Sequence, residues 1–213
     1  MPRKSRVCAC TNVLQRARVC AKVLALRSVN TGSKAMVMQT AILGGGCFWC
    51  TEAVYQQIKG VASVESGYTG GKIPNPTYEQ ICTGKTGHAE VVKLDFDTDI
   101  ISYREILEIF FTVHDPTTLN RQGNDSGTQY RSVIYYLSPE QQQTAQQVIA
   151  SMASVWDAPI VTELSPPETY YKAEAYHQNY FNQHPLQGYC AFVVAPKVAK
   201  VRSTFAGKLS KGK

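Results

Sequence analysis

The chain has 213 residues, of which 44% are hydrophobic and 18% are charged. These are ordinary values for a globular protein, and the length suits one domain with an ample hydrophobic core. No apolar run approaches the roughly 20 residues that a membrane-spanning helix requires, so the sequence offers no candidate for one.

The formal net charge of +6 is concentrated at the two ends of the chain. Residues 1–35 hold 8 Lys and Arg and no acidic residue, and the stretch after Cys190 holds 6 more bases and no acid. Residues 36–190 contain the remaining 8 bases and all 16 acidic residues, which gives this part a net charge of −8. A nucleic-acid-binding protein is expected to carry positive charge on its folded body, so this function class is disfavoured.

Residues 1–35 resemble an organelle transit peptide, because they are rich in Arg and small residues and free of acids. Helical spacing of apolar residues favours an amphipathic presequence, and these residues are Leu14, Ala17, Ala21 and Leu24. We therefore predict import into a plastid or a mitochondrion, with a single domain over residues 36–213. The alternatives are a disordered basic tail or a true start at Met36 or Met38, and the protein would then be cytoplasmic.

The chain contains 7 cysteines, an odd number, and three of them lie within residues 1–35. The sequence has no secretory signal of proper length. A reducing compartment with catalytic thiols therefore fits better than a secreted disulfide scaffold.

The stretch 40–52 combines a short apolar strand, three glycines and the beginning of a helical pattern. It places Cys47 at the helix N-terminus, where unpaired N–H groups and the helix dipole favour an anion, and the thiolate is the reactive form of cysteine. The dipole contributes about 0.3–1 kcal/mol, less than one pKa unit, so other groups must help to ionise the thiol. Phe48 and Trp49 follow directly and indicate an apolar pocket beside a nucleophile.

Other interpretations of this stretch are open. Cys47 could simply pack in the core, since free cysteine is among the most buried residue types. Cys47 and Cys50 could also form half of a zinc site or a thioredoxin-like redox pair. Zinc requires two further ligands at matching spacing, and Cys82, His88 and Cys190 are too scattered to supply them. We favour a reactive cysteine and predict no metal site.

Hydrophobic periodicity and turn residues predict the elements that follow in the chain. Helices are expected over residues 47–59, 102–114 and 138–156, and strands over residues 61–66, 90–97, 131–137 and 160–164. After Pro166 and Pro167 we expect a helix that carries Ala173, Tyr176 and Tyr180 inward, and then extended coil from about residue 184.

The order of these elements contains two split β-α-β units. It predicts an α/β (α+β) fold, a ferredoxin-like two-layer sandwich with extended coil and a C-terminal tail. Cys190 lies within the predicted coil.

Glu90 is exceptional within its predicted strand. Val92, Leu94 and Phe96 occupy one face of the strand, and the period of two places Glu90 in the same apolar row. A carboxyl group buried there would have a raised pKa and could act as an acid near neutral pH. The alternative is that the strand end frays and that Glu90 is a solvated charge at its rim.

With these residues placed, the chain resembles the A-type peptide methionine sulfoxide reductases over about residues 40–190. The family signature Gly-Cys-Phe-Trp-x-x-Glu appears as residues 46–52. Further matching motifs lie, in order, at residues 67–71, 75–78, 86–90, 122–131, 176–178 and 188–190.

The resemblance implies that Cys47 attacks the sulfur of methionine S-sulfoxide, free or in proteins, and becomes a sulfenic acid as methionine leaves. It places the proton donor on Glu90, the oxygen-binding hydroxyls on Tyr78 and Tyr130, and a polar anchor on Asp125. It makes Phe48 and Trp49 the aromatic wall for the S-methyl group. It further implies repair of oxidative damage by a monomer without a cofactor, recycled through a disulfide by thioredoxin or another dithiol.

The chain departs from many family members at Cys50, where they have glycine. Either Cys50 or Cys190 could resolve the sulfenic acid. We predict Cys190, because it occupies the Gly-Tyr-Cys position of the family and a coil leaves it free to move. Helical Cβ atoms three residues apart are roughly 5–6 Å apart, whereas a disulfide requires about 3.5–4.5 Å, so Cys47–Cys50 would need some distortion. Cys82 is interpreted as structural.

Two rival functions remain on sequence grounds alone. A thioredoxin-like disulfide exchanger would use Cys47 and Cys50 but would have no need of Glu90 or the tyrosines. A zinc-stabilised interaction module would bind metal and lack enzymatic activity.

Overall fold

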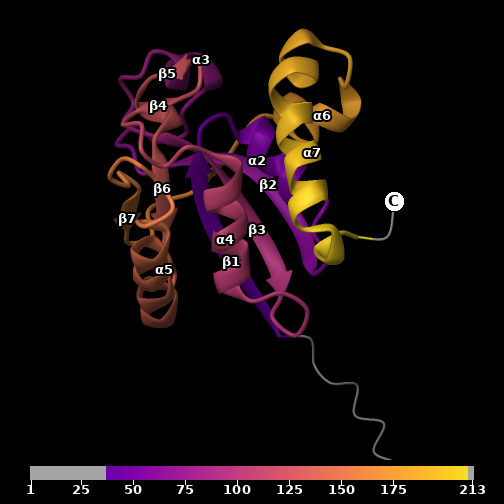
Figure 1. Ribbon diagram of the computed structural model, residues 1–213. Helices are drawn as coiled ribbons and strands as arrows, with labels where there is room; N and C mark the ends of the chain where they lie inside the picture. The colour runs from indigo at the N-terminus through magenta and orange to yellow at the C-terminus, as the bar shows by residue number, and fades with distance from the viewer. Residues whose placement is uncertain (1–36, 211–213) are drawn as a thin grey trace, which may run out of the picture. The chain divides into compact units, whose positions relative to one another are not determined.

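The computed structural model describes residues 37–210, and its central feature is a six-stranded sheet (Figure 1). The strand order is β7-β6-β1-β3-β2-β8. The strands are β1 (Met38–Gly45), β2 (Val61–Thr69), β3 (Ala89–Asp97), β6 (Ser132–Tyr135), β7 (Glu163–Ser165) and β8 (Tyr171–Lys172). The proposed targeting segment, residues 1–35, lies outside the described residues.

Helices connect and flank these strands. The α-helices are α2 (Phe48–Tyr55), α3 (Tyr78–Cys82), α4 (Tyr103–Val113), α5 (Pro139–Met152), α6 (Tyr180–Gln183) and α7 (Ala195–Thr204). Shorter elements are the 3-10 turns η1 (Thr128–Tyr130), η2 (Ala175–His177) and η4 (Ala206–Lys208), and the π-helical turn η3 (Cys190–Val194). A small separate hairpin joins β4 (Arg121–Gln122) to β5 (Asp125–Ser126).

The four central strands confirm the predicted ferredoxin-like pattern. Each of the neighbouring pairs β6–β1, β1–β3 and β3–β2 is antiparallel. Helix α2 connects β1 to β2 and helix α4 connects β3 to β6, so each β-α-β unit is split by a strand inserted between its two strands. β7 extends this sheet in parallel with β6, and β8 adds a short antiparallel edge next to β2.

Alternation along the strands separates the core into two clusters. On one face, Leu43, Leu94 and Phe96 are fully buried with the apolar residues of α2, α4 and α7. On the other face a smaller cluster contains Ile42 and Val91. Glu90 has the same parity along β3 as Leu94 and Phe96, so it belongs to the row that faces the helices.

Helix α4 begins at a capping box formed by Ser102 and Glu105. The Ser102 hydroxyl accepts a hydrogen bond from the Glu105 amide at 3.3 Å, and the Glu105 carboxylate accepts one from the Ser102 amide at 2.8 Å. A cap of this kind contributes about 1 kcal/mol to stability. It fixes the start of the helix whose buried face supports β1.

The structure corrects the predicted C-terminal region. The helix expected to carry Ala173, Tyr176 and Tyr180 is instead the short strand β8, the turn η2 and the four-residue helix α6.

The coil expected from about residue 184 is also wrong, since η3 and α7 form there. Helix α7 packs against α2 and α4 (Figure 1), and its buried Val198 and Val201 continue a stripe that begins at Val194, the last residue of η3, at positions i, i+4 and i+7. The stripe is hard to recognise because valine is a weak helix former and because Pro196 interrupts the pattern, although proline is tolerated in a first helical turn.

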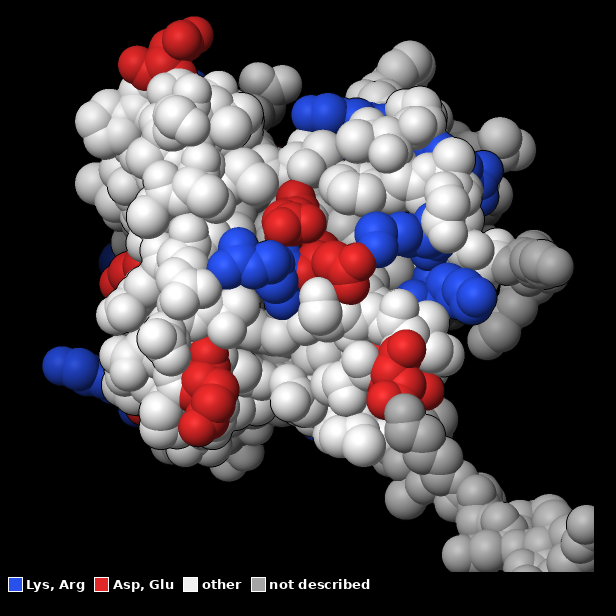
Figure 2. Space-filling view, turned by 60° about the horizontal axis from the view of Figure 1, so that its bottom comes forward, with Lys and Arg blue, Asp and Glu red and all other residues white. Residues whose placement is uncertain are grey.

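Charged side chains of both signs meet on the face drawn in Figure 2, where acidic and basic groups lie next to one another. The ion pairs of the described residues include Arg131–Glu163 at 2.8 Å and Lys172–Glu65 at 2.6 Å. Within residues 37–210, no helix has the length and apolar character needed to cross a bilayer.

Candidate active site

Three glycines, residues 44–46, connect the end of β1 to Cys47. A Cβ atom at Gly44 would lie 2.9 Å from the Glu90 carbonyl oxygen, and one at Gly46 would lie 2.6 Å from the Gln122 side chain. Gly46 also has a φ of +88°, which side chains rarely tolerate. Cys47 then forms the N-cap of α2, with its carbonyl accepting the Cys50 amide at 3.1 Å. The glycines therefore let the start of α2 approach β3 and the loop around Gln122.

Burial dominates the chemistry of the Cys47 thiol, which is 8% exposed. Burial raises the pKa of Cys47 well above its usual value, and the neighbouring Cys50 and Glu90 raise it further. The helix N-terminus is too weak to reverse this effect. Cys47 therefore holds its proton near neutral pH until another group takes it.

Glu90 is buried beside Cys47, with only 2% of its surface exposed. The predicted position in the apolar row of its strand is confirmed, and a solvated charge at the strand rim is excluded. The amide of Phe48 donates a hydrogen bond to Glu90 Oε2 at 3.1 Å. Burial nevertheless raises the pKa of Glu90 to about 8, so the carboxyl group is mainly protonated at neutral pH and able to donate a proton.

Two tyrosine hydroxyls lie within the electrostatic influence of Glu90. Tyr78 opens α3 behind the cap residue Thr77, and Tyr130 ends η1. Burial raises the pKa of both phenols well above the ordinary tyrosine value, and Glu90 adds to the rise in each case. Both hydroxyls therefore remain donors at any working pH.

Tyr189 is a residue of this site that the sequence analysis missed. Its hydroxyl donates a hydrogen bond to Asp125 Oδ2 at 2.5 Å, and it also contacts the thiols of Cys47 and Cys50. The residue lies directly before Cys190 in the Gly-Tyr-Cys motif. That motif was the available signal, but a predicted coil gave no direction for the tyrosine side chain.

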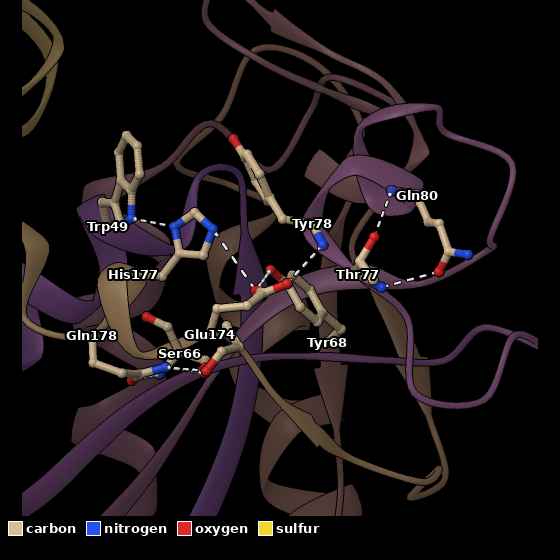
Figure 3. A network of polar contacts seen from close by, with 10 residues as sticks. Trp49, Ser66, Tyr68, Thr77, Tyr78, Gln80, Glu174, His177 and Gln178 are labelled. Carbon is tan, nitrogen blue, oxygen red and sulfur yellow. Dashed lines mark hydrogen bonds and ion pairs between the residues drawn. The ribbon is translucent and has the colours of Figure 1, made fainter.

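Phe48 and Trp49 form an aromatic cluster at the start of α2. The Trp49 ring stacks on Tyr180 with centroids 3.8 Å apart, and its indole N–H donates to His177 Nδ1 at 3.2 Å. Figure 3 shows Trp49 and Tyr78 on either side of the His177 ring. The predicted aromatic wall and one of the predicted oxygen-binding tyrosines thus border the same imidazole.

Cys50 is the cysteine that lies in contact with Cys47. The hydrogen bond from Cys47 lowers the pKa of Cys50 to about 7 against the opposing effect of burial, and the positive charge of Lys197 lowers it further. Lys197 comes from α7 and lines a small cavity with Cys50 and His114. No carboxylate pairs with Lys197 among residues 37–210, so its charge is available to the thiol.

Cys190 is fully buried at the start of η3, and burial raises its pKa, with a further rise from the nearby Cys50. The freedom to move that we expected of this cysteine is therefore absent in this conformation. Cys82 is exposed at the end of α3. In residues 37–210 the four cysteines are all free thiols, and no cluster of three or more His, Cys, Asp or Glu side chains is arranged to hold a metal ion.

Comparison with known proteins places this geometry among related chains. The family model described as "Peptide methionine sulfoxide reductase" matches residues 39–209. A peptide methionine sulfoxide reductase MsrA of Polynucleobacter asymbioticus is 58% identical over 177 residues, covering 82% of this chain and 93% of the relative. An MsrA of Saccharolobus solfataricus is 57% identical over 172 residues, covering 81% and 97%.

Solved structures agree with these sequence relatives. The reduced form of Mxr1 from Saccharomyces cerevisiae is similar with a TM-score of 0.67 and 32% identity, covering 74% of this chain and 94% of that chain. Methionine sulfoxide reductase A of Corynebacterium diphtheriae is similar with a TM-score of 0.66 and 38% identity, covering 73% and 78%.

Proposed function

The chain belongs to the peptide methionine sulfoxide reductase family, and from this premise we propose that Cys47, Glu90 and Cys50 carry out the reduction of methionine S-sulfoxide. The enzyme is an oxidoreductase that converts methionine sulfoxide to methionine. The observation that carries the residue assignment is the buried, protonated Glu90 held against the start of α2 by the Phe48 amide.

In the first step the hydroxyls of Tyr78 and Tyr130 hold the sulfoxide oxygen. Glu90 gives its proton to that oxygen while the Cys47 sulfur attacks the sulfoxide sulfur, and Glu90 is reprotonated by the proton that the thiol loses. The oxygen ends on Cys47 as a sulfenic acid, and methionine leaves with two more electrons on its sulfur. A raised pKa suits Glu90 to this work because the acid form is present at neutral pH.

Substrate binding is assigned to the aromatic cluster and to Asp125. Phe48 and the partly buried Trp49 offer an apolar wall for the S-methyl group. Asp125 accepts the hydrogen bond of the Tyr189 hydroxyl and through it orients the polar side of the substrate. Because this hydroxyl has one proton, it can donate either to Asp125 or to a thiolate.

In the second step we assign the attack on the sulfenic acid to Cys50. The Cys50 thiolate attacks the Cys47 sulfur, and hydroxide leaves as water after taking up a proton. Cys50 contacts Cys47, and the positive charge of Lys197 favours the thiolate form of Cys50. Cys47 is an N-cap residue with a non-helical ψ of 124°, which allows this pair more adjustment than two residues inside a helix would have.

This order revises the prediction that Cys190 resolves the sulfenic acid. That prediction rested on the Gly-Tyr-Cys position of the family and on a mobile coil, and the second ground fails because Cys190 is buried in a helical segment beside Cys50. We assign Cys190 to a later exchange with the Cys47–Cys50 disulfide, after which thioredoxin or another dithiol restores the thiols. The enzyme acts as a monomer on free or protein-bound methionine sulfoxide, without a cofactor, and repairs oxidative damage.

Disulfide mapping tests the order of the cysteines. After one equivalent of methionine sulfoxide and no reductant, peptide mapping is expected to show Cys47 joined to Cys50 first, because the two thiols are already in contact. Cys82→Ser serves as the matched control and should not change the pattern, since Cys82 is exposed at the end of another helix. A rapid Cys47–Cys190 disulfide, with normal recycling of Cys50→Ser, would exclude this order.

Residues 1–35 are proposed to direct the enzyme to a plastid or a mitochondrion. The support is their basic, acid-free composition and the family match, which begins only at residue 39. A chain beginning at Met36 should keep full activity and remain in the cytosol of a eukaryotic host. Equal delivery to the organelle with and without the segment would refute the proposal.

A further inference from the structure

The imidazole of His177 lies among the aromatic side chains of the site, and the proposed reduction of methionine sulfoxide assigns it no role. The side chain is 1% exposed. Its ring centroid lies 5.1 Å from Phe48, 5.6 Å from Trp49 and 4.3 Å from Tyr78. One side chain therefore touches both aromatic residues of the proposed wall and one of the proposed oxygen-binding tyrosines.

The hydrogen bond from Trp49 determines the tautomer of His177. An indole nitrogen can only donate, so His177 Nδ1, which lies 3.2 Å away, must be the unprotonated acceptor. The ring proton of neutral His177 is then on Nε2. This atom is buried without a hydrogen-bond partner, and Glu174 Oε2 is the nearest acidic oxygen at 3.9 Å (Figure 3).

Glu174, from the same short segment as His177, accepts hydrogen bonds from two tyrosines of the site. Its Oε1 accepts the backbone amide of Tyr78 at 2.9 Å, and its Oε2 accepts the Tyr68 hydroxyl at 2.9 Å. His177 and Glu174 are three residues apart around η2. The short segment 174–177 therefore supplies one acceptor to Trp49 and another to Tyr78.

The segment is fixed to the edge of the sheet by Gln178. The amide oxygen of Gln178 accepts from the Ser66 backbone at 3.0 Å, and its NH₂ group donates to the Ser66 carbonyl at 2.9 Å and to the Ala173 carbonyl at 3.0 Å. A single side chain thus ties segment 173–178 to β2, and the acceptors on this segment are held against a rigid element.

We propose that His177 is a positioning residue, which as a neutral acceptor fixes the Trp49 indole at the substrate pocket and, together with Glu174, holds the aromatic wall and Tyr78 in one geometry. The inference rests on the proposed roles of Trp49 and Tyr78 in binding the sulfoxide.

Protonation of His177 would abolish this arrangement, because both ring nitrogens of an imidazolium are donors and Nδ1 would face another donor. The groups that face the ring are the aromatic side chains of Phe48, Trp49, Tyr78 and Tyr176, and the carboxylates of Glu174 and Glu79. Burial lowers the pKa of His177 against the two carboxylates, so the ring is neutral at pH 7. Substrate binding should therefore weaken as the pH falls below the ordinary histidine value of about 6.5.

The test follows the indole directly. The chain has 2 tryptophans, so Trp156→Phe leaves Trp49 as the single indole resonance in a ¹H–¹⁵N spectrum. In this background, His177→Leu should move the indole N–H resonance and raise the KM for methionine sulfoxide roughly 3–10-fold, with kcat changed by less than about twofold. His177→Asn offers an amide oxygen near the position of Nδ1 and should restore much of both values.

An acid titration of the Trp156→Phe protein keeps the proposal testable if His177→Leu fails to fold. The indole resonance should move with the protonation of His177, with a midpoint below about pH 6.5. An indole resonance that does not move in this titration would overturn the proposal, and so would an indole resonance or a KM that is unchanged in a folded His177→Leu protein. The resonance is recorded without substrate, so it decides the hydrogen bond even if the reaction assigned to the site were wrong.

Discussion

Replacement of Cys47 by serine is expected to remove sulfoxide reduction, lowering turnover by roughly 10⁴-fold or more. A serine hydroxyl is a far weaker nucleophile toward sulfur than a thiol. Neither remaining buried thiol can take its place. Cys50 borders a small cavity with Phe110 and Lys197, and Cys190 is enclosed at the start of η3.

The measurement for Cys47→Ser is methionine release with dithiothreitol as reductant, which bypasses recycling by thioredoxin. Cys82→Ser is the matched control, because it removes an exposed thiol while the serine hydroxyl can keep the hydrogen bond with Tyr78, so turnover should stay close to wild type. Turnover of the Cys47→Ser protein at the wild-type rate would show that Cys47 is not the nucleophile.

Glu90→Gln is expected to slow the sulfoxide step by roughly 10²–10⁴-fold, as for the loss of a general acid. The glutamine oxygen can still accept the Phe48 amide, so the change removes the proton with little change in shape. In the wild-type enzyme the first-step rate should fall as the pH rises through about 8, where the acid form of Glu90 is lost. In Glu90→Gln this alkaline limb should disappear.

Stability provides the control for Glu90→Gln. The pKa of Glu90 is about 8 in the folded chain, above the value of about 4.3 expected when it is unfolded. Between these values the folded state binds more protons, so Glu90 makes the protein less stable as the pH rises through this window. Glu90→Gln should therefore unfold at the same or a higher temperature than wild type near pH 8. A rate and pH profile equal to those of wild type would exclude Glu90 as the acid.

Cys47 and Glu90, which local patterns singled out, lie where the sequence placed them. Period-two alternation was sufficient to predict that Glu90 is buried, because a strand has only two faces and one face of β3 packs on helices. The run of three glycines correctly indicated a helix start at Cys47, and Gly46, with a φ of +88°, makes the turn from strand to helix. The fold class followed from the order of these elements.

The features that depend on distant parts of the chain could not be predicted. The pKa of Cys50 is lowered first by the hydrogen bond from Cys47 and then by the charge of Lys197, and this second contribution reaches the thiol only because α7 packs on α2. Tyr189 enters the site only because the segment after residue 188 is helical. The sequence did not predict this helix, because its buried residues Val194, Val198 and Val201 are weak helix formers. The catalytic roles of Tyr78, Tyr130 and Asp125 remain predictions from the family resemblance.

Release of methionine from the two sulfoxide epimers is the most direct test of the central claim. The purified protein is incubated with methionine S-sulfoxide or R-sulfoxide, first without reductant and then with dithiothreitol. We predict one burst of methionine from the S epimer without reductant, continuous turnover of that epimer with dithiothreitol, and no methionine from the R epimer. Absence of methionine from the S epimer under both conditions would contradict the account.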